Sequence, residues 1–156
     1  LTPVSREVFA DLYEHLLTVD EQIKVYDQKI RILVKNTDAC QRLLDVPGIG
    51  PIVATALVMA LGDAQVFKNG RHMAAYLGLV PRQHSSGGKD RLLGISKRGD
   101  RYVRSLLIHG ARAMAFRVKN NPAHENQWLY KLIQRRGMNK AVVAFAIPSL
   151  KGHCVL

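Results

Sequence analysis

A run of apolar residues near the N-terminus constrains the fold of this chain more than any other feature. The apolar positions are separated by gaps that alternate between three and four residues: Phe9, Leu12, Leu16, Val19, Ile23, Tyr26, Ile30 and Leu33. This is the spacing of a heptad repeat, and it predicts one long α-helix. Pro3 suits the first turn of that helix, and Asn36-Thr37-Asp38 is the predicted boundary with the next helix.

Two interpretations of this helix stay open at the level of sequence. The strict spacing favours a coiled coil, so we expect a homo-oligomer that forms through this helix. Additional apolar residues, such as Leu17 and Val25, widen the stripe, as in an amphipathic helix that lies on its own domain. We expect a helical segment over residues 1–37, a compact helical domain over residues 38–147, and an atypical tail over residues 148–156.

Glycine and proline predict a tight turn after the second helix. In Val46-Pro47-Gly48-Ile49-Gly50-Pro51 the prolines are unsuited to a helix interior, and the glycines allow a sharp turn and a close backbone approach. The pattern resembles the helix-hairpin-helix element, in which N–H groups at a helix N-terminus bind a DNA phosphate. Gly48 and Gly50 are therefore candidate contacts. The alternative is that the turn only packs its two helices.

The remaining elements are also predicted to be mainly helical. We expect four more helices: one opened by Asn69-Gly70 and closed by Gly78, one from about Asp100 to Lys119, one that starts at Asn121-Pro122 and stops before Gly137, and one from Lys140 to Ile147 that breaks at Pro148. The segment from Arg82 to Gly94 is predicted to be a loop or a small hairpin that turns at Gly87-Gly88. No run alternates long enough for a large sheet, so the expected fold class is all-α, or nearly so.

The charge of the chain is unevenly distributed. The formal net charge is +11 and the pI is about 10.1. Residues 1–45 hold 6 basic and 8 acidic side chains, whereas residues 46–156 hold 17 basic and 4 acidic ones. We therefore expect the first segment to be a neutral scaffold and the second to face a polyanion.

Most of the surplus cations lie between residues 82 and 119. Ten basic residues lie there, opposed only by Asp90 and Asp100: Arg82, Lys89, Arg91, Lys97, Arg98, Arg101, Arg104, Arg112, Arg117 and Lys119. Lys97-Arg98-Gly99 directly precedes a predicted helix N-terminus, where free N–H groups and the helix dipole favour phosphate. We expect nucleic acid as the partner, with these candidate contacts: Arg82, Lys89, Arg91, Lys97, Arg98, Arg101 and Arg104.

Two serines, Ser85 and Ser86, lie on a glycine loop inside this basic segment. A Walker-type phosphate loop is disfavoured, because Gln83 stands where such a loop needs glycine and Asp90 where it needs Ser or Thr. A serine that attacks a phosphodiester needs an exposed hydroxyl and nearby cations, and this loop offers both. Judged from these residues alone, a flexible connector is the more common use of Ser-Ser-Gly-Gly.

Four stretches, in order and at close spacing, carry a family resemblance: Val46-Pro47-Gly48-Ile49-Gly50-Pro51, Tyr76-Leu77-Gly78-Leu79-Val80-Pro81-Arg82, Ser86-Gly87 and Ile95-Ser96-Lys97-Arg98-Gly99-Asp100-Arg101. From Leu43 to about Ala146 the chain resembles the C-terminal domain of the insertion-sequence 110/116/902 transposases, relatives of the Piv-type DNA invertases. The resemblance implies a transposase or site-specific recombinase. It also implies that the heptad helix is the coiled coil that links the two halves of such enzymes.

The resemblance further implies a nucleophile, a metal and a guide. The candidate nucleophile is Ser86, with Ser85 as the alternate. Family members pair this domain with a RuvC-like N-terminal domain whose four acidic residues bind metal, which we expect to be Mg²⁺, and some are guided by a structured bridge RNA. No such acidic domain is in this sequence, and the chain opens with Leu1 rather than Met, so we expect a piece of a longer protein that is inactive alone. The rival function is a non-catalytic helix-hairpin-helix module that binds nucleic acid.

Other function classes find little support in the sequence. No segment approaches the roughly 20 apolar residues of a membrane span, so we expect no membrane partner and a cytoplasmic, nucleoid-associated location. Cys40 and Cys154 lie far apart in no metal-ligand spacing, and we expect both thiols to be free. The histidines show no ligand spacing either, so we expect no metal site and no cofactor in this chain.

Three further side chains are of types that also serve in nucleic-acid sites. His84 lies two residues before Ser86, which makes it the one histidine to consider, although an ordinary loop histidine is the more common case. Trp128 and Tyr130 are more typical of packing at a core edge than of base stacking.

Overall fold

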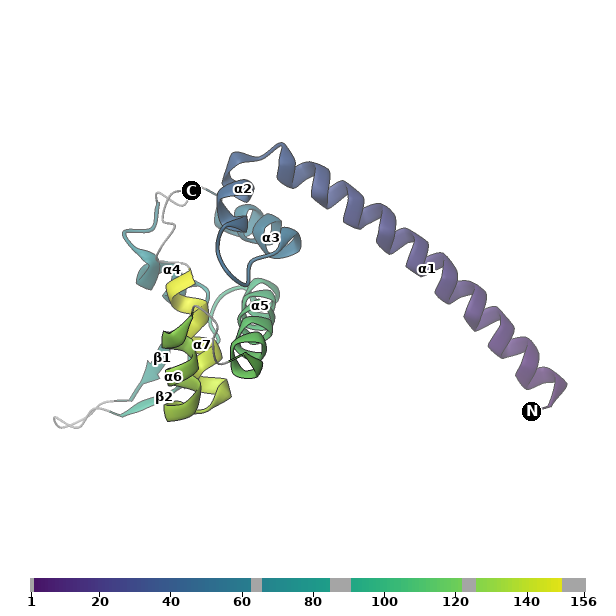
Figure 1. Ribbon diagram of the computed structural model, residues 1–156. Coiled ribbons are helices and arrows are strands. Elements are labelled where there is room, and N and C mark those ends of the chain that lie inside the picture. The colour runs from purple at the N-terminus through teal and green to yellow at the C-terminus, as the bar shows by residue number, and fades with distance from the viewer. Residues whose placement is uncertain (1, 63–65, 85–90, 122–125, 150–156) are drawn as a thin grey trace.

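The computed structural model describes residues 2–62, 66–84, 91–121 and 126–149, and it is mainly helical, as the sequence predicts. The elements are, in chain order, α1 (Pro3–Lys35), α2 (Asp38–Leu44), α3 (Pro51–Leu61), α4 (Gly70–Tyr76), β1 (Pro81–Gln83), β2 (Leu92–Ile95), α5 (Arg101–Asn120), α6 (Gln127–Arg136) and α7 (Met138–Ser149). Figure 1 shows α1 extending away from a compact part that the other elements form.

The long helix α1 begins where Thr2 caps it. The Thr2 side chain accepts a hydrogen bond from the Ser5 N–H at 3.3 Å, and Pro3 occupies the first helical position. Val34 is the only residue of α1 that is buried, and Ile30 packs partly against the core. Most apolar residues of α1 are exposed, among them Phe9 at 59% and Leu16 at 53%. The interpretation of a helix lying on its own domain is therefore wrong, because only the C-terminal end of α1 reaches α2 and α3.

A set of hydrogen bonds fixes the joint between α1 and α2. The Thr37 hydroxyl donates to the Leu33 carbonyl oxygen at 2.9 Å, and the Gln41 side-chain amide donates to the carbonyl oxygen of Lys35. The Gln41 N–H donates in turn to the Thr37 carbonyl oxygen at 3.1 Å. The two side-chain bonds satisfy carbonyl groups at the end of α1, and the backbone bond is the first helical hydrogen bond of α2.

The core of the compact part forms where α5, α6 and α7 pack together and α3 packs on α5. The helix α5 buries one face, which consists of Val103, Leu107, Ala111, Ala115 and Val118. The opposing side chains come from α6 and α7 and are Leu129, Ile133, Ala141, Val142, Phe145 and Ala146. The apolar spacing of three and four residues thus places α5 at the centre of the compact part.

Two predicted boundaries differ from the structure. The helix α6 begins at Gln127, not at Asn121-Pro122, because Asn126 is its cap: the Asn126 side chain accepts from the Leu129 N–H at 3.1 Å. Asn121 instead ends α5. The helix α7 includes Pro148 and ends at Ser149 rather than breaking before the proline. A proline in the last turn of a helix removes only one backbone hydrogen bond. The helix α7 can therefore include Pro148 and end one residue after it.

Within the described ranges, no helix combines the length and the apolar character that crossing a membrane requires.

Candidate nucleic-acid interface

A two-stranded hairpin carries the serine loop. The strands β1 and β2 pair antiparallel, with Pro81 opposite Ile95. The His84 N–H donates to the Arg91 carbonyl oxygen at 2.9 Å, and this bond joins the two residues that flank segment 85–90. The predicted hairpin is therefore present. The candidate nucleophile Ser86, the alternate Ser85 and the candidate contact Lys89 lie outside the described residues.

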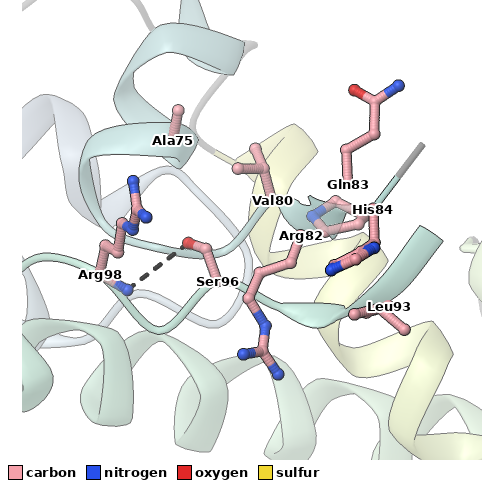
Figure 2. Close-up of a pocket in the computed structure, with 9 residues that line it drawn as sticks. Ala75, Val80, Arg82, Gln83, His84, Leu93, Ser96 and Arg98 are labelled. Atoms are coloured by element: carbon pink, nitrogen blue, oxygen red, sulfur yellow. Dashed lines mark hydrogen bonds between the residues drawn. The ribbon is translucent and has the colours of Figure 1, made fainter. Parts of the chain in front are cut away.

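A cleft of about 430 Å³ lies at the base of this hairpin. Its lining includes Arg82, His84, Ser96 and Arg98, together with apolar side chains of α4 and the hairpin. In Figure 2, Arg98 lies beside Ala75 at one end of the cleft and His84 lies at the other. Arg82 and Arg98, which are 16 positions apart in sequence, therefore border one cavity. A cleft whose border includes two arginine side chains suits an anionic group such as a phosphate.

The turn before α5 presents the next cations. Lys97 has a φ of +57°, a left-handed conformation that costs a non-glycine residue about 1–2 kcal/mol. The Lys97 N–H donates to the Gly78 carbonyl oxygen at 3.0 Å, which holds this turn against the end of α4. Asp100 caps α5 by accepting from the Val103 N–H at 2.9 Å. Lys97, Arg98 and Arg101 are all exposed around this helix N-terminus.

Two glycines let the turn approach α4 at backbone distance. Gly78 has a φ of +72°, and a Cβ at this position would collide with the backbone of Arg98. Gly99 has a φ of +83°, and a Cβ there would collide with the Tyr76 carbonyl oxygen. No side chain can be accommodated at either position, so the close approach of the two turns requires glycine.

Arg104 lies differently from the other candidate contacts. It is partly buried, and its Nη1 donates to the carbonyl oxygens of Leu77 and Arg98 at 3.2 Å and to those of Gly99 and Asp100 at 3.4 Å. Two N–H protons are thus shared among four carbonyl groups. This guanidinium joins the end of α4 to the turn before α5, and Arg104 as a phosphate contact stays a prediction.

The turn between α2 and α3 lies at a separate place on α5. Gly48 has a φ of +89°, and its Cβ position lies 3.0 Å from the Gly110 carbonyl oxygen. Gly110 is equally constrained, because a Cβ there would collide with the carbonyl oxygen of Gly48. Gly50 caps α3, and nothing lies within 4 Å of its Cβ position. The close backbone approach predicted for Gly48 is thus made to α5, while the Gly50 side of the turn is open.

The structure brings together some of the predicted contacts and separates others. Arg82 and Arg98 share the cleft, Arg91 ends the serine loop, and Lys97 and Arg101 flank the α5 N-terminus. Gly48 packs at Gly110, which is nine residues, or roughly 13 Å of helix, farther along α5 than Arg101. The two glycines of the helix-hairpin-helix pattern are therefore not part of the cleft.

Sequence reasoning missed three residues of this region. Ser96 lines the cleft with a partly buried hydroxyl whose oxygen accepts from the Arg98 N–H at 3.5 Å; it lies in a stretch that carries the family resemblance, but no role was predicted for it. Gly78 was expected only to close a helix. Gly110 could have been found, because a glycine inside a strongly predicted helix usually marks a close packing contact.

The described residues show no group of three or more His, Cys, Asp or Glu that could hold a metal ion. The residues present here therefore do not fit a metal site, and no chemical step is derived through one. Cys40 is buried and free, and burial raises the pKa of its thiol above the usual value. Tyr130 packs partly against the core, as expected, whereas Trp128 is half exposed.

Comparison with known proteins identifies relatives of this chain. Residues 40–128 match the family described as "Transposase IS116/IS110/IS902 family". The transposase for insertion sequence element IS1111A of Coxiella burnetii is 47% identical over 94% of this chain and 40% of its own length. The transposase for insertion sequence element IS1328 of Yersinia enterocolitica is 36% identical over 94% of this chain and 44% of its own length. The pilin gene-inverting protein of Moraxella bovis is 33% identical over 67% of this chain and 32% of its own length.

The chain thus spans less than half the length of the relatives that it matches. The matched family segment begins in α2 and ends in α6, so it includes the hairpin, the cleft and the turn before α5. On this evidence the chain belongs to the IS116/IS110/IS902 family of transposases.

Proposed function

We propose that this chain is the C-terminal part of a DNA transposase or site-specific recombinase, in which it binds nucleic acid and supplies a serine nucleophile for strand exchange. The observation that carries the proposal is the cleft at the base of the β1–β2 hairpin, which Arg82 and Arg98 border. The names of the relatives, two transposases and a gene-inverting protein, support the reaction class. We propose this activity for the complete enzyme, of which this chain is one part.

Binding rests on the cations around the cleft and the α5 N-terminus. Arg82 and Arg98 border the cleft, and Lys97 and Arg101 are exposed beside it, where the helix dipole adds to their positive potential. Contacts of this kind bind the sugar-phosphate backbone and carry little sequence information. We therefore expect sequence-tolerant binding that weakens steeply with salt.

In the proposed reaction, the Ser86 hydroxyl oxygen attacks a DNA phosphorus. The new Oγ–P bond forms as the bond from phosphorus to a deoxyribose oxygen breaks, the serine proton passes to a base, and the departing oxygen takes up a proton. The bond between the His84 N–H and the Arg91 carbonyl holds the ends of the serine loop next to the cleft. His84 lines the cleft and precedes Ser86 by two residues in the sequence, so it is the candidate for the proton acceptor among the described residues.

Several partners belong to the same proposal. Metal chemistry, with Mg²⁺, would come from a RuvC-like domain of the complete enzyme, and a structured RNA would guide target choice. The exposed heptad stripe of α1 supports a homo-oligomer that forms through this helix. A protein that acts on bacterial DNA in this way would work in the cytoplasm, next to the nucleoid.

The nucleophile is tested in the complete recombinase with Ser86→Ala and Ser85→Ala side by side. We expect Ser86→Ala to abolish strand exchange and the covalent protein–DNA adduct, while nucleic-acid binding stays unchanged and stability changes by less than about 1 kcal/mol. If Ser85→Ala alone abolishes exchange, the nucleophile is Ser85. If both variants remain active, the serine mechanism is wrong.

Binding is tested by replacing Lys97, Arg98 and Arg101 with glutamine together. Each lost phosphate contact on duplex DNA should reduce the slope of log affinity against log salt by about 0.9. Replacing Arg135 and Arg136 of α6, which are also exposed, gives a control that removes charge elsewhere. An unchanged slope in the triple variant would place the binding surface elsewhere.

The alternative function is a non-catalytic module that binds nucleic acid through the turn between α2 and α3. The observation that favours it is the open side of Gly50 at the start of α3, where a phosphate has room to approach. In that case Gly50→Val should weaken binding more than the triple cation variant does, and no covalent adduct should form in the complete enzyme.

A further inference from the structure

The outer face of α5 carries an unbroken row of exposed side chains beyond the cleft. Successive members of this row are three or four residues apart, so they lie along one face of the helix: Arg101, Ser105, His109, Arg112, Phe116 and Lys119. We refer to them as the α5 stripe. At 1.5 Å per residue the stripe is roughly 27 Å long. It starts at the turn before α5 and ends at the far end of the helix.

Helix stability does not account for the charge of the α5 stripe. The sequence of α5 contains no Asp or Glu, and the ion pair seen among the described residues, Lys24 with Glu21, is on α1. Lys119 in the last turn suits the helix dipole, but Arg101 in the first turn opposes it. Arg112 lies in the middle of the helix, where the dipole has little effect. A row of cations that forms no ion pair with the described acidic residues is complementary to a polyanion.

An aromatic ring stands between two of these cations. Phe116 is 49% exposed, and it follows Arg112 by four residues and precedes Lys119 by three. All three side chains therefore project from neighbouring turns of one face. An aromatic face flanked by cations is the arrangement that binds unpaired bases, because a base stacks on the ring while the cations contact the adjacent phosphates. The bases of an intact duplex are stacked on each other and leave the ring without this partner.

We propose that the α5 stripe binds a single-stranded segment of nucleic acid, with Arg112 and Lys119 on phosphates and Phe116 stacked on a base. The proposal rests on the proposed function for the identity of the polyanion, and it adds a second surface to the cleft. A strand that leaves the cleft at Arg98 and passes Lys97 in the turn before α5 would continue along the stripe.

The test compares three variants of the full chain on a single-stranded DNA of about 20 nucleotides and on the matching duplex. Arg112→Gln with Lys119→Gln should lower single-strand affinity about tenfold and reduce its salt slope by about 1.4, since each single-strand phosphate contact contributes about 0.7. Phe116→Leu should lower single-strand affinity at least about fivefold and leave duplex affinity unchanged. Phe116→Tyr keeps an aromatic face and should bind as the parent chain does.

Two matched controls separate the possible results. Arg135→Gln with Arg136→Gln removes the same charge from α6, and Lys97→Gln with Arg98→Gln removes it from the turn before α5. If the stripe variant binds like the α6 control while the turn variant binds weakly, the stripe is not a binding surface and the proposed function stands. If the turn variant also binds normally, the proposed binding function fails. If Phe116→Leu weakens duplex and single strand equally, or neither, the stripe is not specific for unpaired bases.

Discussion

The two longest helices of this molecule, α1 and α5, are both amphipathic, but their apolar faces have different surroundings. Over α1 the only buried residue is Val34, whereas α5 buries Val103, Leu107, Ala111, Ala115 and Val118. The helices that cover α5 come from the same chain, whereas no other described element covers α1 along most of its length. Apolar spacing therefore determines that a helix forms, while the neighbouring elements determine whether its face is covered. The predictions below test this contrast.

The largest effect should come from the backbone contact that only the compact part contains. Gly78→Ala places a methyl group against the Arg98 backbone, which cannot rotate away as a side chain could. Together with the positive φ of this residue, the collision should cost about 3 kcal/mol or more of unfolding free energy. Urea denaturation followed by circular dichroism measures it.

Gly94→Ala is the matched control for this prediction. Nothing lies within 4 Å of the Cβ position of Gly94, and its φ is not in the left-handed region. The change should alter stability by less than about 0.5 kcal/mol. Equal stability of the Gly78→Ala and Gly94→Ala proteins would show that the two turns do not meet at backbone distance.

The second prediction concerns self-association through α1. Leu16→Glu with Ile23→Glu places charges on two exposed heptad positions and should convert an oligomer into a monomer, without changing the stability of the compact part. Light scattering gives the molar mass. Gln22→Glu with Gln28→Glu adds the same charge off the heptad positions and should leave the oligomer intact. If the parent chain is already monomeric, the prediction of a coiled coil through α1 is wrong.

The third prediction distinguishes two roles for Arg104: stabilising the turn before α5 and binding a phosphate. Arg104→Lys replaces Nη1 with the Nζ of a shorter side chain, which does not extend to the point where Nη1 meets the four carbonyl oxygens, so it should cost about 1–2 kcal/mol of stability and weaken nucleic-acid binding severalfold. Because Arg104 acts through the turn, the salt slope should stay at its parent value. A slope reduced by about 0.9, with stability unchanged, would instead make Arg104 a direct phosphate contact.

The smallest effect is expected for the alkylation rate of Cys40. This residue lies in α2, where α1 joins the compact part. Burial in α2 protects this thiol and raises its pKa, so alkylation at neutral pH should be slow while the chain is folded. Shortening α1 so that the chain starts at Ile30 keeps Val34 and should leave this rate within about twofold. Mass spectrometry follows the modification. A large acceleration would show that the exposed part of α1 stabilises the compact part.

Most of the fold could be predicted from local sequence signals. The heptad spacing, Pro3, Asn69 and Asp100 predicted helices whose boundaries the structure confirms to within about two residues. The predicted start of α6 was wrong. Asn121 and Asn126 can both cap a helix, and the sequence alone does not show which of them begins α6. The surroundings of α1 were ambiguous for a related reason, since a stripe of apolar residues does not specify its partner.

The candidate site was less accessible to sequence reasoning. The basic segment predicted a polyanion surface, but it did not distinguish Arg98, which borders a cleft, from Arg104, which binds four carbonyl oxygens. That difference depends on how the ends of α4 and α5 meet, 20 or more residues apart in the chain. Ser96 also lies in the cleft because of contacts between these distant segments, so its neighbours in the sequence did not indicate its position. Contacts between distant segments leave no local pattern to read.

The joint between α1 and α2 has a mechanical consequence. With 33 residues, α1 is roughly 50 Å long, and it is held at one end by Val34 and the bonds of Thr37 and Gln41. It is a lever: a rotation of about 10° at the joint moves its far end by about 9 Å, which exceeds the rise of two base pairs of DNA. The stiffness of this joint, which depends on Val34 and on the bonds of Thr37 and Gln41, therefore determines how precisely the far end of α1 is positioned.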